Sequence, residues 1–519
     1  MVKAGLLVTG SAFGGSLLGC SSEFVIPCLG PAAPPEPVAG MTYIRASEIG
    51  CALDCSLENG RNKHTGGAAT DDGPRINTAM AGASASNPMT LIIDGSALIS
   101  GLFLPAGGHW NIAGLGCGTG FFVKTGSNSD GIHNGPPDAG TPSDPGPPAP
   151  ARGMNVSLKN FTLNGNQGNG HNGDSTSGFH QGRTGVVWYC GINLMNLDNI
   201  VLDKVVVVNT PAYHVRLSNV GNVTASGCVL KSHGLSTDGL HFDGPANDIT
   251  ISDCDFTMGD DGIALNCPEG YTGNISRVTV TNCTFNSTTM VRLYAIFDNS
   301  SKTTIDNVTV ENCSGTLTVA GFSICDGAGG NPDSVMSLTV SNCSLKAPAV
   351  LDISANFGTV LLKNVTLTPF DSNRPPGLAF IRSSALFFGR QKYIGSSLTF
   401  ENCSILKGDD FDVAALIIEN NSSIANLEFN GFATQAKELL NLVAGSLGNV
   451  VFNAVDTTHI KDPVSPTGFA SIGSIGGTGV LATAWEFPDA VMANGVPFLS
   501  AETHLPSIKV QDVTEPYHP

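Results

Sequence analysis

Short segments in which apolar and polar residues alternate recur along most of the chain. The segments RVTVTNCTF, NVTVENCSG and SLTVSNCSL share one frame and place Cys283, Cys313 and Cys343 at its seventh position. Further copies, some weaker, place at that position Phe161, Val205, Cys228, Cys254, Val365, Cys403, Phe432 and Val455. Consecutive anchors are 22 to 44 residues apart. A short motif that returns at such a period is typical of a solenoid, in which each repeat forms one coil.

Each copy has the two-residue period of a strand with one buried face, and β-branched residues are frequent. We therefore predict an all-β chain whose coils stack into a right-handed parallel β-helix. The cysteines of the frame are interpreted as small buried apolar residues and not as disulfide partners. No Cys-x-x-Cys pair occurs, so no zinc site is expected. Asparagine often precedes the anchor, where stacked side chains can hydrogen-bond between coils, at Asn160, Asn282, Asn312, Asn342, Asn364 and Asn402.

The repeats define the predicted organisation, with a parallel β-helix over residues 41–455. Residues 70–83 carry a helix-start signature with Pro74 in the first turn, and this helix would cap the open end of the first coil. Residues 126–153 are rich in Pro and Gly and are predicted to form a surface loop. Residues 456–519, where the repeat fades, are predicted to form a C-terminal cap or an oligomerisation segment.

Residues 1–40 are predicted to be a separate N-terminal region. Lys3 precedes an apolar run that ends at Cys20 in the segment LLGC, and a Pro-rich linker follows. The pattern resembles an export signal with a bacterial lipoprotein box, which makes Cys20 the candidate lipid anchor. The alternative is an arm that packs on a partner subunit. The expected location is secreted, at the cell surface or in a phage virion, and a monomer and a homotrimer both remain open.

The charge of the chain limits its partners. The formal net charge is -18, and charged residues make up only 13% of a chain that is 41% hydrophobic. An acidic chain repels the phosphates of nucleic acid and anionic membranes, so neither is expected as a partner. A polysaccharide is compatible with this charge, because a few basic side chains in a groove can reverse the local field.

Two segments carry the candidate chemistry. DGLHFD (238–243) and DGIALN (261–266) share one pattern, and Asp260 stands directly before the second. If both form the same strand in successive coils, Asp238 lies over Asp261 at a strand spacing of roughly 4.8 Å. Three carboxylates this close cannot all stay ionised at low cost, so at least one pKa should rise. We predict that Asp238, Asp260 and Asp261 form a functional site.

The same register predicts a column of side chains that point away from the coil axis. It contains Arg216, His241, Ala264 and Arg292, and it would give a cleft that suits an extended polar polymer. The predicted substrate-binding residues are His233, His241, Asp243, Asn266, Arg216 and Arg292.

The motifs STDGLHF and MGDDGIALN, with their separation, resemble the Asn-Thr-Asp-Gly and Asp-Asp-Cys-Ile-Ala motifs of glycoside hydrolase family 28, the polygalacturonases. The segment TDDGPRINTAM is similar to the wider pectate-lyase-like superfamily, which includes phage tailspike depolymerases. The resemblance to family 28 covers residues 195–300 and implies inverting hydrolysis of a polysaccharide, with no cofactor. It makes Asp260 the general acid, while Asp238 and Asp261 activate water.

This sequence also departs from the family pattern. The family's Gly-His-Gly turn after the acid pair is missing, and the only His-Gly nearby, at His233, precedes the first aspartate. The Arg-x-Lys substrate clamp is reduced to Arg292. The resemblance therefore supports the reaction class more strongly than a pectin substrate.

Other interpretations of the same residues remain open. Asp-Gly is a common turn dipeptide, so Asp238 and Asp261 could cap turns. A polysaccharide lyase or uronate epimerase on the same fold would use Asp238, Asp243, Asp260 and Asp261 to bind Ca²⁺. A non-catalytic adhesin or glycan-binding spike would keep the groove and would not need paired acids.

Overall fold

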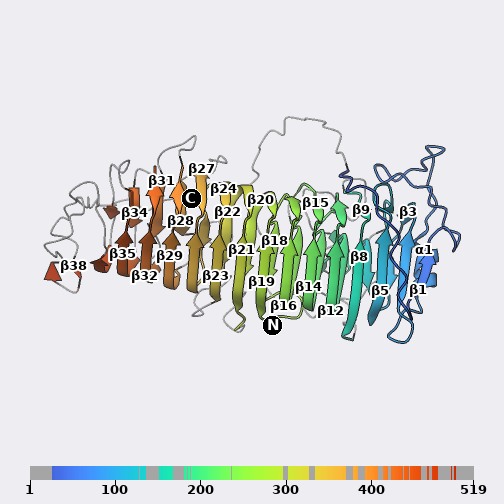
Figure 1. Cartoon of the computed structure of the whole chain (residues 1–519), viewed down its shortest axis with the longest axis horizontal. Coiled ribbons are helices and arrows are strands. Elements are labelled where there is room, and N and C mark those ends of the chain that lie inside the picture. The colour runs from blue at the N-terminus through green and yellow to red at the C-terminus, as the bar shows by residue number, and fades with distance from the viewer. Residues whose placement is uncertain are drawn as a thin grey trace.

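A computed structural model describes most of the chain from residue 26 to residue 456, and four short strands beyond it. The gaps within this range are 128, 136–150, 168–179, 184, 188, 235, 296–301, 326–333, 370–377, 384–391, 407–412, 419–421, 436–437 and 443–444. The strands of successive coils stack side by side along one long axis, from the N-terminal coils at one end to the C-terminal coils at the other (Figure 1). The predicted parallel β-helix is confirmed.

The first sheet contains the frame found in the sequence, and its strands pair in parallel from coil to coil. Its strands are β1 (Thr42–Arg45), β2 (Met89–Ile93), β5 (Gly108–Gly114), β8 (Gly153–Lys159), the second halves of β12 (Ile192–Asp203), β14 (Val215–Ser226) and β16 (Leu240–Ser252), then β19 (Ile275–Thr281), β21 (Ile305–Glu311), β23 (Val335–Ser341), β26 (Phe357–Lys363), β29 (Ile394–Glu401), β32 (Ser422–Asn430), β35 (Gly445–Asn453) and β37 (Ala470–Gly476).

The second sheet follows the anchor position of each coil. Its strands are β3 (Ser96–Ile99), β6 (Gly120–Val123), β9 (Thr162–Asn164), β13 (Val206–Val208), β15 (Val229–Lys231), β17 (Asp255–Thr257), the first halves of β20 (Thr284–Tyr294) and β22 (Ser314–Cys325), β24 (Ser344–Ala347), β27 (Thr366–Pro369), β30 (Ser404–Ile405) and β33 (Ala433–Thr434).

The third sheet closes each coil and carries the candidate site. Its strands are β4 (Leu102–Leu104), β7 (Ile132–Asn134), the first halves of β12, β14 and β16, then β18 (Ile263–Asn266), the second halves of β20 and β22, β25 (Leu351–Ile353), β28 (Leu378–Ser383), β31 (Val413–Ile418), β34 (Glu438–Leu442) and β36 (Val464–Pro466). Two short antiparallel pairs lie outside the stack: β10 (His180–Arg183) with β11 (Gly185–Val187), and β38 (Met492–Ala493) with β39 (Val496–Pro497).

The predicted capping helix is present as α1 (Gly73–Met80), which lies at the N-terminal end of the stack (Figure 1). Ile76 and Met80 are buried against the first coils, as an amphipathic cap requires. Asp72 stands at the N-cap position but makes no side-chain cap bond. Its carboxylate instead accepts hydrogen bonds from the amides of Ala52 and Leu53 at 2.8 and 2.9 Å, and so ties the preceding loop to the helix.

Two predicted boundaries differ in the structure. The predicted surface loop 126–153 contains β7, which is buried and pairs with β4 and β12. The coils also continue past residue 455, because β36 pairs with β34 and β37 pairs with β35. A weak apolar alternation near the end of the chain therefore still forms coils.

The interior of the stack is a continuous apolar core. Aromatic rings of successive coils stack on one another, as Phe256 does on Phe285 with ring centroids 4.7 Å apart. The anchor cysteines are buried and form no disulfide with one another, which confirms that they act as small apolar residues: Cys228, Cys254, Cys283, Cys313, Cys343 and Cys403. The asparagines before the anchors all have a left-handed backbone, with φ between 51° and 56°.

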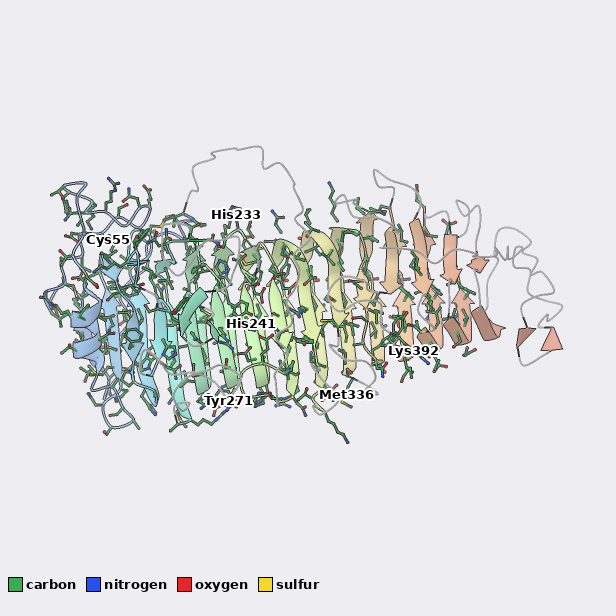
Figure 2. All side chains as sticks on the ribbon, turned by 180° about the vertical axis from the view of Figure 1, so that it is seen from behind. Cys55, His233, His241, Tyr271, Met336 and Lys392 are labelled. Atoms are coloured by element: carbon green, nitrogen blue, oxygen red, sulfur yellow. A yellow bond between two sulfur atoms is a disulfide. The ribbon has the colours of Figure 1, made fainter. Side chains whose placement is uncertain are left out.

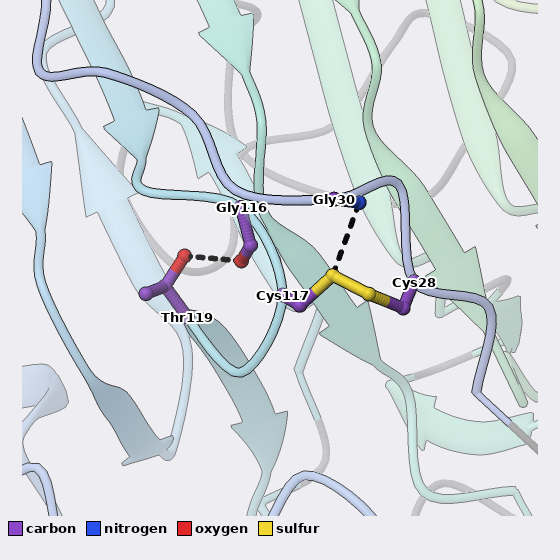
Figure 3. The surroundings of a disulfide bond; sticks show 5 residues. All are labelled: Cys28, Gly30, Gly116, Cys117 and Thr119. Atoms are coloured by element: carbon purple, nitrogen blue, oxygen red, sulfur yellow. Dashed lines mark hydrogen bonds between the residues drawn. A yellow bond between two sulfur atoms is a disulfide. The ribbon is translucent and has the colours of Figure 1, made fainter.

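One disulfide is formed among the described residues, between Cys28 and Cys117, which are 89 positions apart (Figure 3). It holds the described part of the N-terminal region against the second sheet, where the Ala32 amide also donates to the Leu115 carbonyl at 2.9 Å. Within the described residues, no helix is long and apolar enough to cross a membrane. The predicted lipid anchor at Cys20 lies outside the described residues.

Candidate active site

The predicted register of the two acidic segments is confirmed. Leu240 pairs with Ile263 and Phe242 with Leu265, so Asp238 and Asp261 each stand two residues before the same point of successive coils. The amide of Asp261 donates a hydrogen bond to Oδ1 of Asp238 at 3.3 Å. The two carboxylates are thus fixed by the stacking of β16 and β18.

The glycines after these aspartates are needed for packing between coils. Neither Gly239 nor Gly262 has a positive φ, so neither serves a left-handed turn. A Cβ on Gly239 would lie 2.4 Å from the carbonyl oxygen of Gly262 and 2.6 Å from the ring of Phe256. A Cβ on Gly262 would lie 2.5 Å from the ring of Phe285. The Asp-Gly pairs therefore mark close approach of the coils, and the turn-capping interpretation does not describe them.

Asp260 joins the other two aspartates in one cluster. Asp238, Asp260 and Asp261 each place one carboxylate oxygen so that all three oxygens lie within 4.8 Å of one another. Asp238 is 2% exposed and Asp261 is fully buried, whereas Asp260 keeps part of its surface in solvent. Oδ2 of Asp260 accepts a hydrogen bond from the amide of Ser236 at 3.1 Å. Of the three acids, Asp260 is therefore the one that a ligand can reach from solvent.

Asp261 has unequal oxygens. Its Oδ1 accepts a hydrogen bond from the hydroxyl of Thr289 at 2.5 Å. Its Oδ2 is buried, accepts no hydrogen bond from the described residues, and lies 3.8 Å from Nη1 of Arg292. A buried carboxylate oxygen without a donor is costly, so this atom is a candidate acceptor for a ligand or a bound water.

The environment raises the pKa values of two of these carboxyls, as the sequence predicted for at least one. Burial raises the pKa of Asp260 well above its ordinary value, and the charges of Asp261 and Asp238 raise it further. Burial and then Asp238 raise the pKa of Asp261 to about 7, against the opposing charge of Arg292. At neutral pH the cluster therefore holds a proton, and Asp260 is the acid most able to present it to solvent.

His241 lies between three carboxylates in the middle of the third sheet (Figure 2). Its Nδ1 is 2.7 Å from Oδ2 of Asp238, and its Nε2 is 2.9 Å from Oδ1 of Asp243 and 3.1 Å from Oε2 of Glu269. Burial alone would lower the pKa of His241, but the hydrogen bonds to the three carboxylates outweigh burial and raise it well above its ordinary value. The imidazole is therefore an imidazolium at neutral pH.

Asp243 links this imidazolium to a second cation. Its Oδ2 accepts from Nε of Arg216 at 2.8 Å and from the hydroxyl of Ser218 at 2.5 Å. Burial would raise the pKa of Asp243, but Arg216 and then His241 and Ser218 outweigh it and hold the pKa at about 2. The result is a chain of alternating charges from Arg216 through Asp243 and His241 to Asp238.

These contacts correct part of the predicted binding surface. The column Arg216, His241, Ala264 and Arg292 is confirmed by the register of β14, β16, β18 and β20. However, Arg216 is 4% exposed, and His241 and Asp243 are fully buried. Alternation along a strand indicates that a side chain points away from the coil axis, but another segment can still cover it. The expectation that these three side chains lie on an open surface is therefore wrong, while a substrate-binding role for them stays a prediction.

The remaining predicted binding residues comprise one buried and two exposed or partly exposed side chains. Asn266 is buried and donates through Nδ2 to Oε1 of Glu269 at 3.1 Å. Arg292 keeps 16% of its side chain exposed, and its guanidinium lies over the ring of Tyr294 at 4.9 Å. His233 is exposed at the edge of the sheet (Figure 2). Among the predicted binding residues, Arg292 and His233 therefore remain the candidates for direct contact with a ligand.

Three residues of the site were not predicted from the sequence. Glu269 stands in the loop after β18 and contacts His241. The ring of Tyr213 stacks on the imidazole of His241, with centroids 3.7 Å apart and an interplanar angle of 14°. His214 is buried, its Nδ1 is 2.9 Å from the carbonyl of Asp238, and burial lowers its pKa to about 4. The only available signal was that they are near the acidic segments in sequence. Nearness in sequence does not show that a side chain contacts the site in the structure.

The stack of parallel coils defines this molecule as a parallel β-helix protein with an acidic cluster on one sheet. No protein-family model matches the chain, and no curated protein gives a significant match.

Solved structures do match the fold. A family 28 exopolygalacturonase of Yersinia enterocolitica is 13% identical, with a TM-score of 0.51 over 85% of this chain and 79% of that chain. The tailspike protein of E. coli bacteriophage HK620 is 11% identical, with a TM-score of 0.50 over 84% and 78%. An N-terminal fragment of bacteriophage Phi29 gene product 12 is 15% identical, with a TM-score of 0.50 over 91% and 71%. The chain therefore shares its β-helix fold with these solved structures.

Proposed function

We propose that this protein is a glycoside hydrolase that cleaves a polysaccharide held along the third sheet of the β-helix. The observation that carries the proposal is the convergence of Asp238, Asp260 and Asp261 within 4.8 Å, with the pKa of Asp260 raised well above its ordinary value. Glycosidic hydrolysis needs one protonated and one ionised carboxyl at the scissile bond. The structural neighbours, which include an exopolygalacturonase and a phage tailspike, support a glycan-directed role on this fold.

The three aspartates take different roles in the proposed reaction. Asp260, which is partly exposed and protonated, donates its proton to the glycosidic oxygen as the sugar carbon gains positive charge. Asp238 and Asp261 form the buried side of the cluster, and they orient and deprotonate a water molecule. Oδ2 of Asp261 supports this role, because it is a buried acceptor to which no residue in the described part of the chain donates.

The stereochemistry is a separate part of the proposal. The oxygens lie within 4.8 Å, which is below the roughly 6.5–9.5 Å typical of two carboxyls in inverting enzymes and near the roughly 5 Å of retaining ones. We nevertheless favour inversion, because Asp238 and Asp261 are buried and expose too little surface to bond a sugar carbon directly. The anomeric configuration of the first product, read by proton NMR, decides between the two.

The test is a glycan library incubated with the protein and assayed for new reducing ends. Asp260→Asn should abolish release while binding is kept, because the amide is isosteric and carries no transferable proton. The matched control is Asp253→Asn, which makes the same change on the same coil at an exposed position with φ 56° that asparagine tolerates. A library in which no glycan is cleaved by the wild-type protein contradicts the hydrolase proposal and favours a non-catalytic adhesin or spike.

A calcium-dependent polysaccharide lyase is the second candidate, because the three clustered oxygens could also hold a cation. Arg292 would supply a positively charged side chain next to such a site, because its Nη1 lies 3.8 Å from Oδ2 of Asp261. Loss of activity on adding a chelator, with the absorbance of an unsaturated sugar in the product, would assign the lyase. Activity that survives the chelator and gives saturated products would assign the hydrolase, which needs no metal.

We further propose that the protein works outside the cell, on a cell surface or in a virion. The disulfide Cys28–Cys117 supports an oxidising compartment. Light scattering of the purified protein distinguishes the monomer from the homotrimer. Mass spectrometry of protein from its native source shows whether Cys20 carries a lipid.

A further inference from the structure

His241 has carboxylates on both of its ring nitrogens. Nδ1 faces Asp238 at 2.7 Å, and Nε2 faces Asp243 at 2.9 Å and Glu269 at 3.1 Å. An ionised carboxylate can only accept hydrogen bonds, so both ring nitrogens must carry protons for these contacts to be favourable. With ionised carboxylates at both nitrogens, this geometry favours a positively charged ring at this point of the sheet.

The orientation of the ring is fixed from three sides. Tyr213 stacks on one face with centroids 3.7 Å apart, and the strand of His241 is paired on both sides, with β14 and with β18. Asp243, which receives Nε2, is itself held by Arg216 and Ser218. The ring is fully buried, so it does not take a substrate as its partner.

The cations are distributed unequally over the three aspartates. Asp238 contacts the imidazolium at hydrogen-bond distance. Asp261 has Arg292 at 3.8 Å, beyond hydrogen-bond distance. Asp260 accepts a hydrogen bond from the amide of Ser236, which is not charged. An opposite charge in direct contact favours the ionised form of a carboxyl most strongly, so the negative charge of the cluster belongs on Asp238.

We propose that His241 is a positioning residue that keeps Asp238 ionised and thereby leaves the proton of the cluster on Asp260. The inference rests on the proposed hydrolase function for its consequence in catalysis, but not for its geometry. It replaces the substrate-binding role predicted for His241 with an electrostatic one. The arrangement is completed by Asp243 and Glu269, whose carboxylates compensate the buried positive charge of His241, and by Arg216, which pairs with Asp243.

The first test needs no substrate. The chain has 11 histidines, and ¹³C-labelled histidine NMR with His241→Gln identifies the resonance that disappears. That resonance should keep the chemical shift of an imidazolium at pH values well above about 6.5, the ordinary pKa of histidine. In Asp243→Asn, which removes one of the facing carboxylates, it should titrate at a lower pH. A wild-type resonance that titrates near 6.5 would overturn the proposal, whatever the enzyme does.

The second test is the pH profile of kcat/KM on the best substrate of the library. Without the imidazolium, the carboxylates of the cluster lose a nearby positive charge, so the acidic limb of the His241→Gln profile should move up by roughly 1 pH unit or more. The control is His133→Gln, which makes the same change at a buried histidine of β7, three strands from His241 in the same sheet and outside the acidic cluster. A uniform loss of rate in His241→Gln, with both limbs unmoved, would assign a merely structural role.

The two tests separate failure of this inference from failure of the proposed function. If no glycan is cleaved but the His241 resonance behaves as expected, the hydrolase proposal fails and the charge arrangement stands. If glycans are cleaved and the resonance titrates near its ordinary value, the hydrolase proposal stands and this inference fails.

Discussion

Asp238 and Asp261 occupy the same register position of two successive coils, and the amide of one donates to the carboxylate of the other at 3.3 Å. The repetition that builds the fold thus forces two like charges together. Folding gains nothing from that contact, so its free energy cost should be visible in the stability of the protein.

Asp260→Asn should stabilise the fold increasingly as the pH rises. The pKa of Asp260 is raised, so above its ordinary value of 3.8 the unfolded chain releases a proton that the folded protein retains. Wild-type stability therefore falls as the pH rises toward the folded pKa, by about 1.4 kcal/mol for each pH unit in between. Urea unfolding of both proteins at about pH 4 and about pH 7 measures the difference. A difference that is the same at both pH values would contradict the raised pKa.

Gly239→Ala should destabilise the protein by about 3 kcal/mol, as expected for overpacking between backbone and a buried ring. The new Cβ would lie 2.4 Å from the Gly262 carbonyl oxygen and 2.6 Å from Phe256, and neither neighbour is the end of a flexible side chain. Glycan cleavage should fall with it, because Asp238 is the adjacent residue. Gly107→Ala is the control, since a Cβ there meets no atom within 4 Å. Equal unfolding midpoints for the two variants would show that the coils can separate at low cost.

His214→Gln should remove an acid-sensitive part of the stability. The pKa of His214 is lowered from 6.5 to about 4, so the unfolded chain binds this proton more readily than the folded protein. The wild-type protein accordingly loses about 3 kcal/mol from this residue as the pH falls from above 6.5 to about 4. Urea unfolding at the two ends of this pH range should show that the free energy of unfolding falls by that much less in the variant than in the wild-type protein. His241, whose raised pKa has the opposite sign, is common to both proteins and cancels in the comparison.

Asn364→Ala should cost roughly 1 kcal/mol more than Asn364→Gly, because a left-handed backbone disfavours a Cβ by about that amount. Asn364 has φ 51°, and its Nδ2 donates to Oδ1 of Asn342 at 2.8 Å. Both variants lose this hydrogen bond, so the difference between them isolates the backbone. Denaturant unfolding gives the two free energies. If alanine and glycine are equal here, the asparagine column serves only its side-chain hydrogen bonds.

The anchor cysteines should resist thiol reagents in the native protein and react after unfolding. Cys283 and Cys313 are 1% and 2% exposed, and neither forms a disulfide. Titration with a chromogenic thiol reagent, with and without guanidinium, counts the reactive groups. Rapid reaction of these cysteines without denaturant would show that the coils open locally.

Much of the fold could be predicted because a β-helix repeats its pattern in sequence. The frame around Cys283 and Cys313 fixes which residues point inward, and the echo of the two acidic segments fixes the register of Asp238 on Asp261. The asparagine column was also predicted, but the reason given for it was incomplete. All six asparagines have a left-handed backbone, as Asn342 does with φ 53°, and the side chain of Asn364 also donates a hydrogen bond to that of Asn342.

The environment of the site could not be predicted in the same way. Whether His241 meets a substrate or the protein depends on Glu269 and Tyr213, which lie outside the repeated frame. A period of two residues gives the direction of a side chain but not what covers it. The disulfide between Cys28 and Cys117 was missed for a related reason, since neither cysteine belongs to the frame and 89 positions separate them.

The three aspartates come from 24 consecutive residues, 238 to 261, in a molecule whose coils extend far on both sides of them. The next coil still contacts the cluster through Thr289, and the coils beyond it lengthen the sheet. Gain or loss of a distant coil would therefore alter how long a ligand the surface spans and leave the carboxyl cluster as it is. The length of ligand that the sheet can span and the chemistry of the carboxyl cluster are thus separate properties of this chain. Each can vary while the other is held constant.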